Sequence, residues 1–420
     1  MNSTALGTIE KKSVDPFFSG RRHRPELDGL RGLAIILVMA SHYAWYLPVH
    51  GNWFIPIGDV ISKGWTGVDL FFVLSGFLIT GVLLDSKGQK NYFRNFYARR
   101  ILRIFPLYYG FLSCLLVIMV FLKFDSPEGS QLYSVAQRQL HEQPWLWTFT
   151  ANLYTVFTGR WLTIVAHLWS LSVEEQFYLI WPLAILLVRC QRFSRLCVAV
   201  IIGSLLLRIA LTADGFSWAR IYVLMPCRAD AFAMGAFVAV ILRTSPEKLR
   251  NGGLMAIWIC GLALLAAIMP TILVEMPWRP GSTAAAPEYL AGLWRGVRLD
   301  GMYSIISGFF AGVVGVLSVP GRMMGVRQLL SSWPMRRFGR YSYALYIYHY
   351  TLLSLSAYYF PATRFPLGEA RPWVSVEFLV LNIGLSFTLA VASYHCFEKY
   401  FLKLKRYFPE ETRMPTRASA

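Results

Sequence analysis

Charged residues are scarce in this chain, and acids are scarcer than bases. Only 15% of the 420 residues are charged, with 23 Asp and Glu against 41 Lys and Arg. Hydrophobic residues make up 55% of the chain and the mean hydropathy is +0.45, which excludes an ordinary soluble domain and is typical of a polytopic membrane protein. The six cysteines have no C-x-x-C spacing, so the sequence predicts neither a disulfide framework nor a metal site.

Long apolar runs recur along the chain and are separated mostly by short loops. They predict an all-α polytopic membrane protein with about ten transmembrane helices in a single membrane domain, residues 26–406. A polar, basic lead (1–25) precedes this domain and a polar tail (407–420) follows it. The candidate spans lie at roughly 28–47, 67–84, 104–122, 168–188, 196–212, 222–242, 254–274, 300–319, 341–360 and 375–397.

The net charge of +18 could suggest a nucleic-acid partner, but the positions of the basic residues indicate another cause. Most of them lie before the first span, in alternate loops and after the last span, whereas the intervening loops hold few. This is the positive-inside pattern, so we expect both termini in the cytoplasm. Membrane lipid is the expected partner, and nucleic acid is not.

An arginine and a histidine share one face of the first span. His42 follows Arg31 by eleven positions, which places their side chains on one stripe of a helix about 16 Å apart. A titratable imidazole deep in the span and a cation near its cytoplasmic end suggest chemistry on an anionic substrate. A snorkelling arginine and a helix–helix hydrogen bond are the structural alternatives.

The second span opens with Gly67-Val68-Asp69-Leu70-Phe71-Phe72 and continues to Ser75 and Gly76. Asp69 enters at a depth near that of His42, where a carboxylate needs a partner. Small residues such as Ser75 allow close helix contact, and helix packing explains them as well as substrate binding does.

A basic segment precedes the third span and contains Arg99, Arg100 and Arg103. If the segment is helical, Arg99 and Arg103 lie one turn apart and can grip one phosphate cluster. Anchoring of the topology by cytoplasmic arginines is an equally good explanation.

Two adjacent glutamates, Glu174 and Glu175, lie in the fourth span at about the depth of His42. Carboxylates in an apolar span indicate a functional site, and a glutamate can orient an imidazole. Adjacent residues point about 100° apart on a helix, so we expect only one of them to face the His42 cavity, and either is possible.

Two further polar groups give weaker signals. Arg228 and Asp230 in the sixth span could form a self-satisfied ion pair or serve a site. His349 follows several aromatics in the ninth span, where a hydrogen-bonded core histidine is the favoured interpretation.

These motifs, taken in order, make the chain similar to the integral-membrane acyltransferase family 3, whose members include O-antigen, exopolysaccharide and macrolide acyltransferases. The resemblance runs from Leu27 to about Leu404. It is carried by the Arg31–His42 spacing, Gly67 to Phe72, the arginines before the third span, Ser172 to Tyr178, Arg228 to Asp230, and Ser342 to His349.

The resemblance implies an enzyme of bacterial inner membranes that transfers an acyl group, usually acetyl, from cytoplasmic acyl-CoA to a hydroxyl of a carbohydrate or lipid-linked glycan. Acyl-CoA would be a co-substrate, and no tightly bound cofactor is expected. Some members carry a further hydrolase-like domain after the membrane domain, and here we expect the membrane domain alone.

The resemblance also suggests roles for the polar residues. His42, polarised by Glu174 or Glu175, would remove the proton of the acceptor hydroxyl. Arg31, Arg99, Arg100 and Arg103 would hold the phosphates of CoA, and the supporting residues would be Asp69, Ser75, Arg228, Asp230 and His349. A transporter or exporter of an acyl group or anion, without catalysis of its own, is the alternative function.

Overall fold

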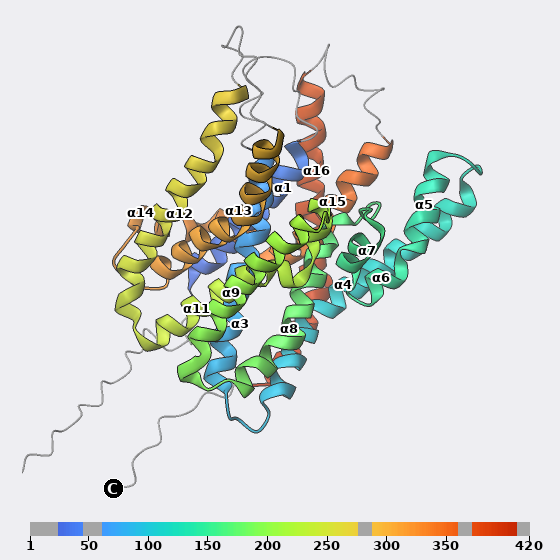
Figure 1. Cartoon of the computed structure of the whole chain (residues 1–420). Coiled ribbons are helices and arrows are strands. Elements are labelled where there is room, and N and C mark those ends of the chain that lie inside the picture. The colour runs from blue at the N-terminus through green and yellow to red at the C-terminus, as the bar shows by residue number, and fades with distance from the viewer. Residues whose placement is uncertain (1–23, 45–60, 276–287, 360–371, 410–420) are drawn as a thin grey trace, which may run out of the picture.

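Helices form all of the secondary structure that this computed structural model describes, over residues 24–44, 61–275, 288–359 and 372–409 (Figure 1). Each predicted span overlaps one long helix. These helices are α1 (Pro25–Ala44), α3 (Gly67–Ser86), α4 (Tyr92–Asp125), α8 (Trp169–Leu187), α9 (Cys190–Ala213), α11 (Met225–Thr244), α12 (Pro246–Glu275), α13 (Glu288–Leu317), α15 (Trp333–Tyr359) and α16 (Pro372–Ser393).

Shorter elements connect these helices or follow the last of them. They are η1 (Lys63–Thr66), α5 (Gln131–His141), α6 (Gln143–Trp147), α7 (Ala151–Thr158), η2 (Ala166–Leu168), α10 (Trp218–Val223), α14 (Met324–Leu330), η3 (Tyr394–Glu398), α17 (Lys399–Lys403) and η4 (Leu404–Tyr407). The N-terminal lead and the polar tail lie almost wholly outside the described residues.

Eight helical stretches in the described ranges are long and apolar enough to cross a membrane, which confirms an all-α polytopic membrane protein. α8 and α15 are not among them, because their polar residues, Glu174 and Glu175 in α8 for example, lower the local hydropathy. The number of ten crossings therefore stays a prediction.

Several helices begin well before the apolar run that predicted them. α4 begins at Tyr92 and α15 at Trp333, each at least eight residues before the expected boundary. Hydropathy marks where a helix enters lipid, whereas its backbone hydrogen bonds continue as long as the chain permits. Both extensions carry arginines, and two of those on α4, Arg100 and Arg103, line the pocket described below.

Glycines let the helices around this pocket approach closely. A Cβ on Gly76 of α3 would overlap the carbonyl oxygen of Phe232 in α11, and one on Gly235 would overlap that of Val73. α1 crosses α15 in the same way, since a Cβ on Gly339 would overlap the carbonyl oxygen of Asp28. The contact between α3 and α11 is sealed by Phe72, whose ring stacks on Phe232 at 4.5 Å.

We expect Gly76→Ala and Gly235→Ala to destabilise the protein, each by about 1–3 kcal/mol, because an added methyl group would force two backbones apart. The matched control is Gly203→Ala in α9, where nothing lies within 4 Å of the new Cβ. This control substitution should leave the free energy of unfolding unchanged or raise it slightly. Thermal unfolding in detergent measures all three, and equal melting temperatures would contradict the close α3–α11 contact.

Candidate active site

A pocket of about 770 Å³, its open mouth included, lies among α1, α3, α4, α8 and α15. One end is basic and the other is aromatic. The polar residues that line it are Arg31, Ser75, Arg100, Arg103, Ser170, Glu174, Tyr178, Ser342, Tyr343 and Tyr346.

Three arginines form the basic end. Arg31 comes from the start of α1, and Arg100 and Arg103 come from the N-terminal extension of α4. The guanidinium of Arg100 lies 5.1 Å from the ring centre of Tyr178. Arg31 forms an ion pair with Asp28 at 3.5 Å, which neutralises only part of this charge. The arrangement suits a multiply charged anion.

Arg99 does not join this cluster. Its Nη1 donates a hydrogen bond of 3.0 Å to the carbonyl oxygen of Phe408, and the residue lines a separate small pocket with Pro409. The expected grip of Arg99 and Arg103 on one phosphate cluster is therefore wrong. Helical spacing places two Cα atoms on one face, but the nearest acceptors decide where long side chains end.

Of the two adjacent glutamates, Glu174 lines the pocket and Glu175 does not. The Glu174 carboxylate accepts hydrogen bonds from the hydroxyls of Ser75 and Tyr178, which themselves lie 3.1 Å apart. The sequence could not decide between the two glutamates, and Ser75 proves to be a partner of the one that faces inward.

His42 is paired with a second histidine and not with a glutamate. Its Nδ1 lies 3.0 Å from Nε2 of His349, and its ring meets that of Tyr350 edge-on at 4.8 Å. The expected glutamate contact is wrong because α1 packs chiefly against α15, which presents His349 to it. His349 is thus hydrogen-bonded, as predicted for it, but its partner is the proposed base.

The hydrogen bonds of His349 define the tautomers of the pair. Its Nδ1 lies 2.9 Å from the carbonyl oxygens of Leu345 and Tyr346, which only accept, so Nδ1 carries the proton. In the neutral ring Nε2 is then an acceptor, and His42 must donate to it through Nδ1–H. This leaves the lone pair of His42 on Nε2, the state that a general base requires.

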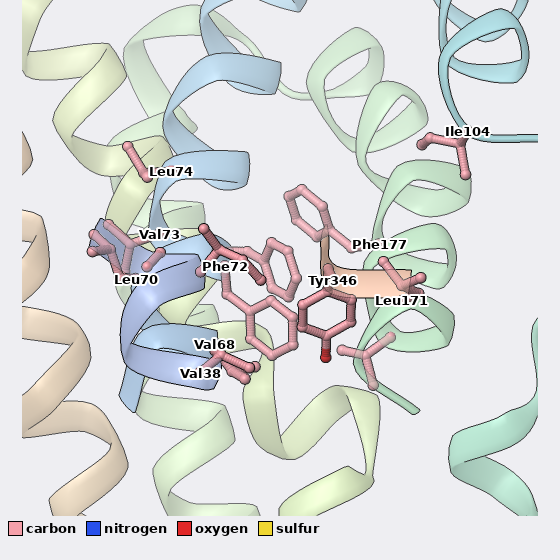
Figure 2. Close-up of a cluster of buried hydrophobic side chains, with 14 of the residues drawn as sticks. Val38, Val68, Leu70, Phe72, Val73, Leu74, Ile104, Leu171, Phe177 and Tyr346 are labelled. Carbon is pink, nitrogen blue, oxygen red and sulfur yellow. The ribbon is translucent and has the colours of Figure 1, made fainter. Parts of the chain in front are cut away.

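Tyr346 links the pocket to the histidines. Its hydroxyl lies 2.5 Å from Ser170 Oγ, and its ring centre is 5.7 Å from that of His349 and 5.4 Å from that of His167. Figure 2 shows it among Phe72, Phe177 and Leu171. His42 is not itself among the residues that line the pocket. The sequence placed Tyr346 among the aromatics on the side of His349 but gave it no role of its own.

Two buried ion pairs lie beside the pocket, and neither joins Arg228 to Asp230. Arg228 pairs with Asp69, whereas Asp230 accepts a 2.9 Å hydrogen bond from Arg208. Of the two possibilities that the sequence left open for Arg228 and Asp230, the self-satisfied ion pair is not formed. Residues two apart on a helix point in different directions, so each found its partner on another helix. Arg208 is a charge within an apolar run, and no role was predicted for it from the sequence.

Aromatic rings surround Arg228. The guanidinium lies 4.5 Å from the ring centre of Tyr303 and 5.1 Å from that of Tyr222. These cation–π contacts and the Asp69 carboxylate hold a charge that is fully buried. The pair joins α3 to α11 and so supports the wall of the pocket.

No group of three or more His, Cys, Asp or Glu in the described part of the chain could hold a metal ion. Arg31 and Glu174 line one pocket of a membrane protein, and the paired histidines His42 and His349 lie beyond its lining residue Tyr346.

The sequence matches the family described as an acyltransferase domain over residues 24–394, and the chain belongs to that family. It is 28% identical over 400 residues to the peptidoglycan O-acetyltransferase OatA of Listeria monocytogenes, an alignment that covers 92% of this chain and 59% of that protein. Against the putative peptidoglycan O-acetyltransferase YrhL of Bacillus subtilis the identity is 29%, covering 90% of this chain and 55% of the relative. The O-acetyltransferase OatA of Staphylococcus aureus is 27% identical, with 94% and 59% covered.

The chain thus spans little more than half the length of these relatives. No solved structure matches it. The relatives are bacterial membrane acetyltransferases, and with its apolar helices the chain is a multi-pass bacterial membrane protein.

Proposed function

We propose that the chain is a membrane O-acyltransferase that moves an acyl group, foremost acetyl, from acyl-CoA to a hydroxyl of a carbohydrate in the inner membrane or at its surface. The observation on which this rests is the order of groups along α1. Arg31 lies at the basic end of the pocket, and the His42 base lies three turns farther along the same helix. Family membership and the printed names of the relatives support acyl transfer to a sugar polymer.

The donor would enter from the basic end. CoA carries its phosphates at one end of a long pantetheine arm and its thioester at the other. Arg31, Arg100 and Arg103 can hold the diphosphate. The eleven residues from Arg31 to His42 then give the arm about 16 Å, and the Glu174 carboxylate lies along this path, where it can accept from the amide groups of pantetheine.

The chemistry follows from the tautomer of His42. As the acceptor oxygen bonds to the thioester carbonyl carbon, its proton passes to His42 Nε2. The tetrahedral intermediate then collapses, the C–S bond breaks, and the imidazolium returns the proton to the departing CoA thiolate. His349 holds the ring in the correct orientation throughout. Tyr346 lines the pocket and its ring centre lies 5.7 Å from that of His349, so we expect this side chain to turn aside when the thioester reaches His42.

The test uses purified protein in lipid nanodiscs with radiolabelled acetyl-CoA and muropeptide or oligosaccharide acceptors. We expect label to appear in an ester of the carbohydrate and free CoA to be released in equal amount. The same protein reconstituted in sealed vesicles tests the alternative, a transporter. Label that crosses these vesicles without forming such an ester would refute the proposal.

We expect Arg103→Gln to raise the KM for acetyl-CoA about tenfold, because a charge-assisted contact to phosphate is lost. The KM for the acceptor and kcat should change far less. The matched control is Arg99→Gln, four residues earlier on α4, whose side chain bonds the backbone of Phe408. Steady-state kinetics measure the KM for acetyl-CoA of both variants. An equal rise in both would contradict a donor contact by Arg103 that Arg99 does not share.

A further inference from the structure

A second basic cavity lies next to the donor pocket. It has a volume of about 590 Å³, its open mouth included, and is lined by Asp28, Trp333, Arg336, Arg337 and Arg340. Asp28 is the only acid in this lining, and it forms an ion pair with Arg31, which lines the donor pocket. The two cavities therefore adjoin at the Asp28–Arg31 pair, at the same end of α1.

The close crossing of α1 and α15 builds this cavity. Gly339 lets the start of α15 lie directly against the backbone of Asp28. The arginines at positions 336, 337 and 340 then surround one space, since residues three and four apart are neighbours on a helix. They follow directly on the N-terminus of α15, where the helix dipole disfavours cations and favours an anion.

Trp333 adds an aromatic surface to the three cations. Its side chain is 64% exposed, and the guanidinium of Arg337 lies 5.0 Å from its ring centre. With one face near Arg337, the indole offers a further surface on which a planar base can stack. Basic residues on this side of a membrane protein follow from topology alone. An exposed indole beside them, in a cavity that adjoins the donor pocket, is better explained by a nucleotide.

We propose that this cavity binds the adenosine 3′-phosphate end of the acyl-CoA donor. The inference rests on the proposed function and names the part of the donor that the first pocket leaves unplaced. With the diphosphate at Arg31, Arg100 and Arg103, the adenosine extends past Asp28 into the second cavity. The 3′-phosphate meets Arg336, Arg337 and Arg340, and the adenine stacks on Trp333.

The experiment compares acetyl-CoA with 3′-dephospho-acetyl-CoA, each as a competitor of labelled acetyl-CoA on the nanodisc-bound protein. The wild type should bind the dephospho form about tenfold or more weakly, because charged contacts to one phosphate are lost. In the triple variant Arg336→Gln, Arg337→Gln, Arg340→Gln, this difference should disappear. Trp333→Ala should weaken both donors about tenfold and leave their ratio unchanged.

Two controls keep a folding defect from imitating the result. Arg250→Gln, at an exposed arginine near the start of α12, should keep the wild-type ratio. S-acetyl-pantetheine lacks the nucleotide, so the triple variant should use it as well as the wild type does.

A ratio that survives in the triple variant, or no difference between the donors in the wild type, would overturn the inference and leave the proposed function standing. If the triple variant binds both donors as the wild type does but its activity no longer depends on anionic lipid, the cavity binds a phospholipid headgroup. This result would overturn the inference as well. A wild type that binds no acetyl-CoA would instead refute the proposed donor.

Discussion

His42→Ala should lower the rate of acyl transfer by about 10²–10⁴-fold, the range that a positioned general base contributes. The hydrogen bonds of His349 leave Nε2 of His42 unprotonated, so this nitrogen has the lone pair that a base needs. The measurement is acetyl ester formation by purified protein, with the amount of folded protein checked by size exclusion. His141→Ala, at an exposed histidine of α5, is the matched control.

His349→Ala should also slow transfer, although less, because His42 would keep its lone pair and lose its orientation. The donor affinity of both variants should stay close to that of the wild type, since neither histidine lines the arginine pocket. A wild-type rate of acyl transfer by His42→Ala would rule out His42 as the base. Loss of donor binding by either variant would indicate a collapsed fold.

The second large effect concerns the buried pair of Asp69 and Arg228. We expect Asp69→Ala to destabilise the protein by about 3–5 kcal/mol, because it leaves a guanidinium without a counter-charge in a fully buried place. The double replacement Asp69→Leu, Arg228→Met should cost far less. Oδ2 of Asp69 and Nε and Nη1 of Arg228 have no hydrogen-bond partner, so the native pair is itself incompletely satisfied.

Thermal unfolding in detergent, followed by size exclusion, measures these variants. Asp214→Asn, at an exposed aspartate after α9, is the control and should unfold like the wild type. A double variant as unstable as Asp69→Ala would show that the ion pair does more than satisfy its own charges, for instance by binding the acceptor.

The sequence predicted the positions of the long helices well, because apolar runs of bilayer length have few other structures open to them. It placed the ends of α4 and α15 poorly. Their first turns are polar, and nothing in the hydropathy pattern distinguishes a helix that continues into water from a loop. Both misplaced ends carry arginines of the proposed donor site.

The partners of polar residues were harder to predict than the residues themselves. That Asp69 needed a partner was clear from its place in an apolar run, but Arg228 lies 159 positions away and the choice depended on how α3 packs on α11. Likewise, periodicity leaves 100° between Glu174 and Glu175 and cannot say which faces inward. His42 and His349 are both in recognised motifs, yet only the crossing of α1 and α15 brings them together.

The most direct measurement is a structure of the protein with a non-hydrolysable acetyl-CoA analogue, in which a ketone replaces the thioester. We predict its diphosphate among Arg31, Arg100 and Arg103, and its carbonyl carbon past a displaced Tyr346, near Nε2 of His42. An analogue bound in the opposite direction, or one whose carbonyl lies far from both histidines, would contradict transfer by this route.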